Sequence, residues 1–216
     1  DVGMTPEAAV RYALEVDKAP VVLLDAGDNI GAGSSGDSTL ILEQAIAQGA
    51  DSYVQTLRDP EAVAACDAVG VGGHVEIQVG GKTDDLHGRP VSITGTVRVL
   101  SDGAFEDNRP LHAGWTFFDQ GRCAVVDCES GQALLLVSTS IGNVSIEQYY
   151  SVGLRPEEFK IVVAKGVMSP RPAYEPIASE MILVNSPGAT SADLTTFDYA
   201  HRRTPLYPFE DQAKYE

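Results

Sequence analysis

The chain has 216 residues and a formal net charge of −16 at pH 7, from 31 acidic and 15 basic side chains. This balance argues against nucleic acid and against an anionic membrane surface as partners, because both bind basic faces. Hydrophobic residues make up 44% of the chain, and no apolar run approaches the roughly 20 residues that span a bilayer. The length suits a single domain, residues 1–216.

The cysteines and the amino terminus favour a reducing location. Cys66, Cys123 and Cys128 are few and odd in number, which argues against a disulfide framework. The spacing of the last two does not match a zinc knuckle, so we expect all three to be small buried groups. The first residues have neither the basic nor the apolar region of a signal peptide. We therefore expect a cytoplasmic protein, and Asp1 in place of an initiator Met indicates a fragment.

The first third of the chain alternates predicted helices and strands. A capping Thr5 followed by Pro6 begins a helix, and Asp37 or Ser38 is expected to cap another. The predicted helices cover about 5–16, 37–48 and 59–70, and the predicted strands cover 20–25 and 52–57. This order indicates a parallel α/β unit with right-handed crossovers.

The middle of the chain shows strand alternation instead. Strands are predicted over 74–79, 91–100, 123–127 and 133–137, with turn signals at Gly80-Gly81-Lys82 and Glu129-Ser130-Gly131-Gln132. These hairpin signals predict an antiparallel or mixed region of sheet. Residues 101–121 are rich in Gly, Asp and Asn, and we expect them to form a long surface excursion.

The last third returns to α/β character. A short helix is predicted over 146–152, a helical turn begins at Pro156, and strands follow at 159–164 and 181–184. Residues 186–216 contain three prolines and are expected to form an irregular tail packed over the surface. The predicted fold is therefore α/β: a mixed sheet with flanking helices and an antiparallel hairpin region.

Three polar loops follow apolar strands, at 25–37, 138–143 and 165–174. Ligands of open α/β sheets gather at the carboxyl ends of strands, so these loops form a candidate site if they converge. They would supply the carboxylates of Asp25 and Asp28, the ammonium of Lys165, the guanidinium of Arg171 and the phenol of Tyr174.

Each of these residues also has a structural interpretation. Buried carboxylates need a partner or a metal, but Asp28 and Asn29 are also common turn residues. Lys165 could extend along apolar surface to reach water. Arg171 lies between two prolines, which we expect to hold it in an extended backbone suited to a carboxylate. The sequence leaves open which of Asp25 and Asp28 faces a cleft.

Several catalytic motifs are absent from the sequence. The glycines of residues 31–36 do not match a dinucleotide fingerprint, and no Lys stands where a phosphate-binding loop needs one. The four histidines, at 74, 87, 112 and 201, form no metal-binding spacing. No GxSxG motif is present, and a Ser-His-Asp set cannot be assembled from spacing alone.

Residues 28–39 resemble a family signature. They read Asp-Asn-Ile-Gly-Ala-Gly-Ser-Ser-Gly-Asp-Ser-Thr, similar to the Asp-Asn-Pro-Gly-Gly-Gly-x-x-Gly-Asp-Ser-Thr of the microcystinase C (MlrC) family. Ile30 replaces the usual Pro and Ala32 replaces a Gly. Further matches follow in order at 59–63, 80–84, 165–176 and 203–208, so the resemblance covers nearly the whole chain.

The resemblance implies the C-terminal domain of a larger zinc-dependent metallopeptidase or amide hydrolase. The main zinc ligands of that family lie in an N-terminal domain, which would be the partner of this chain, and this domain alone would be inactive. The expected substrate contacts are Asn29, Lys165, Arg171 and Tyr174, and the expected metal contact is Asp28. The substrate would be a peptide or a small amide. Catalytic residues are not assigned.

Two other interpretations remain at this point. The chain could be a non-catalytic module that binds a small anion or a peptide at its glycine loop. It could also be a structural domain that serves assembly, including a homodimer. Binding by the isolated domain without zinc would favour the first, and the mass of the protein in solution tests the second.

Overall fold

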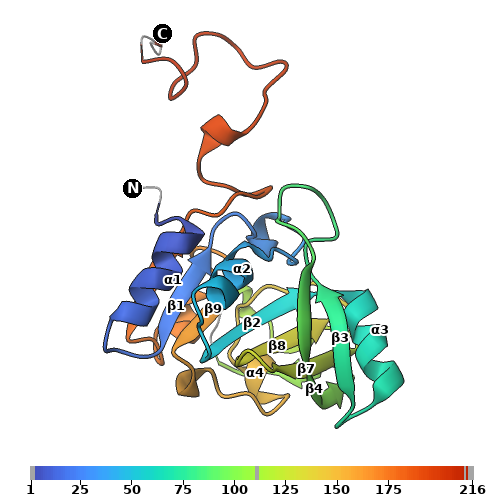
Figure 1. Cartoon of the computed structure of the whole chain (residues 1–216). Coiled ribbons are helices and arrows are strands. Elements are labelled where there is room, and N and C mark those ends of the chain that lie inside the picture. Colours follow the sequence, from blue (N-terminus) through green and yellow to red (C-terminus); the bar gives the residue numbers. More distant parts are fainter. Residues whose placement is uncertain (1–2, 110–111, 212, 214–216) are drawn as a thin grey trace.

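An eight-stranded mixed sheet organises the chain (Figure 1). The computed structural model describes residues 3–109, 112–211 and 213. The strand order is β10-β1-β9-β2-β8-β7-β4-β3. The strands from β10 to β8 are mutually parallel, and β7, β4 and β3 continue the sheet antiparallel. The α/β class and the mixed sheet are confirmed.

The strands lie close to the predicted positions. The parallel ones are β1 (Val21–Asp25), β2 (Tyr53–Arg58), β8 (Gln132–Val137), β9 (Ile161–Lys165) and β10 (Glu180–Val184). The antiparallel ones are β3 (His74–Val79), β4 (Val91–Ser101) and β7 (Cys123–Cys128). The central parallel strands are apolar along their length because both of their faces are covered.

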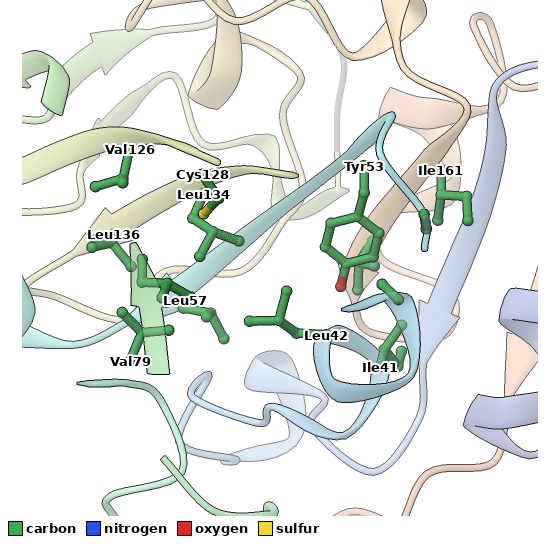
Figure 2. Packing of buried hydrophobic residues seen from close by; sticks show 14 of the residues in the cluster. Ile41, Leu42, Tyr53, Leu57, Val79, Val126, Cys128, Leu134, Leu136 and Ile161 are labelled. Carbon is green, nitrogen blue, oxygen red and sulfur yellow. The ribbon is translucent and has the colours of Figure 1, made fainter. Parts of the chain in front are cut away.

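Helices cover both faces of the sheet. One face packs against α1 (Pro6–Glu15), α2 (Leu40–Ala47) and α3 (Pro60–Val69). Figure 2 shows Leu42 of α2 pointing toward Leu57 of β2 in this cluster, with Ile41 of α2 on the side of Tyr53. The opposite face packs against the short helices α4 (Glu147–Tyr150) and α5 (Arg171–Tyr174). Short 3-10 turns occur at η1 (Ile30–Ala32), η2 (His112–Gly114), η3 (Pro156–Glu158) and η4 (Leu194–Thr196).

The predicted surface excursion contains a small second sheet. Strands β5 (Ala104–Glu106) and β6 (Phe117–Asp119) pair antiparallel. The rings of Phe105 and Phe118 stack with centroids 4.9 Å apart, and both pack on Val144. We call residues 104–109 and 112–119 the arm. Its strands have three residues each, too few for alternation to be visible in the sequence.

Two local predictions are wrong. Neither Asp37 nor Ser38 caps α2, because the N-cap is Thr39 and no side-chain bond is made there. The Asp37 carboxylate instead accepts hydrogen bonds from the backbone N–H groups of Lys82 and Thr83, at 2.9 and 3.0 Å. Arg171 is not extended but begins α5. The flanking prolines fit there because the first helical positions need no N–H donor.

The first residues of the carboxyl-terminal tail pack on the glycine loop, where Ser186 Oγ accepts the N–H of Gly27 at 3.0 Å and Thr190 Oγ1 accepts the N–H of Asn29 at 2.9 Å. Figure 1 shows the last segment extending away from the body of the molecule. Within it, Arg202 pairs with Glu210 at 2.6 Å. The three cysteines are free and buried, as expected. Among the described residues, every helix is too short or too polar to cross a bilayer.

Candidate functional site

The loops that follow β1, β8 and β9 converge at one edge of the sheet. Together with the arm they enclose a groove of about 690 Å³. The glycine loop after β1 contributes Ile30 and Gly31, the loop after β8 contributes residues 140–142, and Ser169 follows β9. These loops leave the carboxyl ends of parallel strands, the usual ligand-binding edge of an open α/β sheet. The groove is therefore the candidate site.

The lining of the groove is mostly apolar and aromatic. Trp115 and Phe117 of the arm are 58% and 75% exposed and face it alongside Phe118. Trp115 meets the Phe118 ring edge-on, with centroids 6.5 Å apart. A volume of several hundred Å³, aromatic walls and a few polar groups are typical of a small-ligand or peptide site. The polar groups here are His112, Asp119, Ser140 and Ser169.

Gly36 allows the glycine loop to approach the loop after β8. Its φ is +81°, in the left-handed region that side chains rarely adopt. A Cβ at this position would lie 2.7 Å from Ser140 Oγ and 3.0 Å from Ile30 Cδ1. Both of those residues line the groove. The glycine therefore sets how closely two of its walls approach each other.

A buried charge cluster lies at the same end of the sheet. Asp25, the last residue of β1, stands in register beside Lys165, the last residue of β9. Lys165 Nζ donates to Asp28 Oδ2 at 2.7 Å and lies 3.7 Å from Asp25 Oδ2. All three side chains are at most 1% exposed. Both carboxylates are therefore buried, and the charged group beside them is the Lys165 ammonium.

Asp28 organises the glycine loop. Its Oδ1 accepts the N–H of Gly36 and its Oδ2 accepts the N–H of Ser38, both at 2.8 Å. Burial alone would raise the pKa of Asp28, but the charge and hydrogen bond of Lys165 and the bonds from the loop outweigh it, so the pKa falls to about 2. The carboxylate is therefore ionised, and its hydrogen bonds to the N–H groups of Gly36 and Ser38 fix the backbone of the glycine loop.

The buried carboxylate of Asp25 has fewer stabilising partners than that of Asp28. Ser186 Oγ donates to its Oδ1, and the N–H of Asp28 also donates there at 3.3 Å, but Oδ2 is buried without a hydrogen bond. Burial raises the pKa of Asp25, although the Lys165 charge opposes the shift. One ammonium thus faces two carboxylates, and it bonds directly to Asp28.

This asymmetry predicts unequal losses of stability when each carboxylate is neutralised. We expect Asp28→Asn to lower the free energy of unfolding at pH 7 by about 2–4 kcal/mol, because it leaves Lys165 without its bonded partner. Asp25→Asn should change it by less than about 1 kcal/mol, since a poorly compensated charge disappears. Urea denaturation of both variants tests this. A larger loss in Asp25→Asn than in Asp28→Asn would contradict it.

The residues expected to contact substrate lie beside the groove rather than in its lining. Lys165 and Tyr174 are buried. Asn29 donates its N–H to Thr190 Oγ1 at 2.9 Å, and its own Oδ1 is buried without a hydrogen bond. The Arg171 side chain is 33% exposed and lies 3.7 Å from Glu175. The sequence analysis did not select Trp115. The signal that could have identified it was the one tryptophan of the chain standing in the polar segment 101–121.

The donor set does not form a metal centre. Among the described residues, no group of three or more His, Cys, Asp or Glu side chains is placed to hold a metal ion. Both oxygens of Asp28 accept hydrogen bonds, and the nearest cation is the Lys165 ammonium. A metal ion bound to Asp28 would be repelled by that ammonium. The described residues of this chain therefore do not form a zinc site by themselves.

Comparison with known proteins identifies the family of this chain. The family model described as MlrC C-terminus matches residues 23–201. The chain belongs to this family. Microcystinase C from Sphingomonas sp. is 26% identical over 218 residues, which cover 96% of this chain and 40% of that protein.

A solved structure from Mesorhizobium sp. BNC1, with the provisional designation metallopeptidase, has the same fold. Its TM-score is 0.86 at 25% identity, covering 100% of this chain and 42% of that one. The chain thus spans about two fifths of the length of both relatives. In this MlrC C-terminal domain, the signature loop is the segment that Asp28 organises. Ile30, in place of the signature Pro, lines the groove.

Proposed function

We propose that this chain is the C-terminal domain of a longer zinc-dependent metallopeptidase or amide hydrolase, and that its groove forms one wall of the cleft that binds a peptide or amide substrate. The observation that carries the proposal is the convergence of three loops and the arm at the carboxyl edge of the sheet. The designations of the two relatives supply the reaction class.

The residues of this chain would bind and orient the substrate. The aromatic arm and Ile141 would hold an apolar side chain, and burial of such a group contributes about 1.5–3 kcal/mol. The groups around Asp28 and Lys165 would keep the glycine loop in place. Arg171, partly exposed at the start of α5, could turn to a substrate carboxylate. The zinc would be held by an N-terminal domain of the same protein, in a reducing cytoplasm.

Metal content tests this division of roles. We expect the full-length protein to retain tightly bound zinc after dialysis and the isolated chain to retain none. Asp28→Asn in the full-length protein should leave the zinc content unchanged, with Asp17→Asn, an exposed site, as its matched control. Elemental analysis per mole of protein measures this. Stoichiometric zinc in the isolated chain, or its loss in Asp28→Asn alone, would refute the assignment.

A non-catalytic binding module makes a different prediction. The isolated chain would then bind a peptide or anion tightly without zinc, and the full-length protein would not cleave amides. Calorimetry of the isolated chain with dipeptides and phosphate, beside a peptidase assay of the full-length protein, separates the two functions.

A further inference from the structure

A Ser-His-Asp arrangement lies beside the glycine loop and outside the groove lining. Ser34 Oγ is 2.8 Å from His87 Nε2, and His87 Nδ1 is 2.8 and 2.9 Å from the two oxygens of Asp84. The N–H groups of Leu86 and His87 donate to Asp84 Oδ1 at 2.8 and 3.2 Å, so the carboxylate is held in place. These distances are those of a nucleophile, a base and an orienting acid.

The hydrogen bonds of His87 define its tautomer. The backbone N–H of Ala189 donates to Nε2 at 3.2 Å, so this nitrogen carries a lone pair. The proton then lies on Nδ1, between the ring and Asp84. Asp84 thereby directs the lone pair toward Ser34, which is the form that a general base requires.

The backbone around Ser34 also suits a nucleophile. Ser34 lies on the loop between strand β1 and helix α2, with the small residues Ala32 and Gly36 two positions before and after it. Among the described residues, the N–H of Ser35 makes no backbone or side-chain hydrogen bond. The N–H that follows a nucleophile is a common oxyanion donor, and small neighbours allow the tight turn. The chain order, Ser then Asp then His, matches that of α/β hydrolases.

We propose that Ser34 is the nucleophile of a second, metal-independent esterase site in this chain, with His87 as its base and Asp84 as the positioning residue. Ser34 Oγ bonds to the carbonyl carbon of an ester while its proton moves to His87 Nε2. The carbon–alkoxide bond breaks, and the alcohol leaves with that proton. Water then attacks the acyl carbon and passes a proton to Nε2, which returns it to Ser34 Oγ as the carboxylic acid departs.

The surroundings select a small ester without negative charge. Ser34 is 7% exposed, so only a compact acyl group reaches its hydroxyl. Asp28 Oδ1 lies 4.0 Å from His87 Nε2. This negative charge stabilises the imidazolium that forms during acyl transfer and repels anionic esters. Once Nε2 is protonated, its own N–H faces the N–H of Ala189, and the hydrogen bond between the two nitrogens is lost. Residues 187–190 must therefore shift in each cycle.

Covalent labelling of the full-length protein tests the site. The probes are an ethyl fluorophosphonate and p-nitrophenyl acetate, with the modified residue located by peptide mass mapping. We expect one adduct on Ser34, formed equally with and without a metal chelator. Ser34→Ala should abolish it, and Ser151→Ala, at an exposed position after α4, should retain it.

The rate of labelling separates a base from a structural histidine. His87→Gln should slow the modification of Ser34 by about 100-fold or more. If that variant does not fold, Asp84→Asn, whose side chain is 35% exposed, should give a comparable slowing. No adduct on Ser34, or an unchanged labelling rate in the folded variants, would overturn the proposal and leave these residues as a structural link between three loops.

Discussion

Lys165→Met is expected to lower the free energy of unfolding at pH 7 by about 3–5 kcal/mol. The substitution keeps most of the apolar volume of the side chain but leaves Asp25 and Asp28 buried without a cation. Removing one partner of a buried ion pair costs far more than the pair contributes, because the remaining charge is uncompensated. Urea denaturation followed by circular dichroism measures the loss.

An exposed lysine provides the matched control. Lys18→Met removes the same charge from an exposed position and should change the free energy of unfolding by less than about 0.5 kcal/mol. Equal unfolding midpoints for Lys165→Met and the parent protein would show that the ion pairs of Lys165 with Asp25 and Asp28 do not stabilise the fold.

The same cluster predicts a pH dependence. The pKa of Asp28 is about 2 in the folded state against an ordinary value of 3.8, so the unfolded chain binds more protons. Its contribution is complete above about pH 4 and is lost as the pH falls toward about 2. Asp25 acts in the opposite direction, because its raised folded pKa makes protonation favourable to the fold. The difference between the parent and Asp28→Asn should therefore shrink below pH 4.

Trp115→Ala in the full-length protein is expected to raise KM for a peptide with a large apolar side chain by about 10- to 100-fold, the range of a central aromatic contact. The change should affect kcat less, because the ring lies on a binding wall. Steady-state kinetics measure both. The matched control is Tyr207→Ala, which removes a 62% exposed ring from the tail. An unchanged KM in Trp115→Ala would exclude the arm from the cleft.

The sequence predicts the central sheet well because its strands are buried on both faces. The runs at Val21–Asp25 and Ile161–Lys165 are apolar and end in a charge, so both the strands and the candidate loops are visible. That Asp25 stands beside Lys165 follows from strand order and register, which local patterns do not encode. The resemblance to the MlrC family supplies the domain identity, and the structure supplies the groove.

Other features depend on contacts that are distant in sequence. Ser34 and His87 are 53 positions apart, and no motif joins them. The arm is held by the stacking of Phe105 on Phe118, and its strands are too short to show a pattern. Prolines around Arg171 are compatible with both an extended segment and a helix start, and tertiary packing of Tyr174 against the sheet favours the helix.

The fluorescence of Trp115 tests most directly whether the groove binds substrate. It is the one tryptophan in this chain, so the difference between the parent full-length protein and Trp115→Phe isolates its emission. In metal-depleted protein, which should bind the peptide without cleaving it, we expect a saturable blue shift as the 58% exposed ring is covered. An unchanged Trp115 spectrum at peptide concentrations that saturate the zinc-loaded enzyme would contradict the assignment of this domain as a substrate-binding wall.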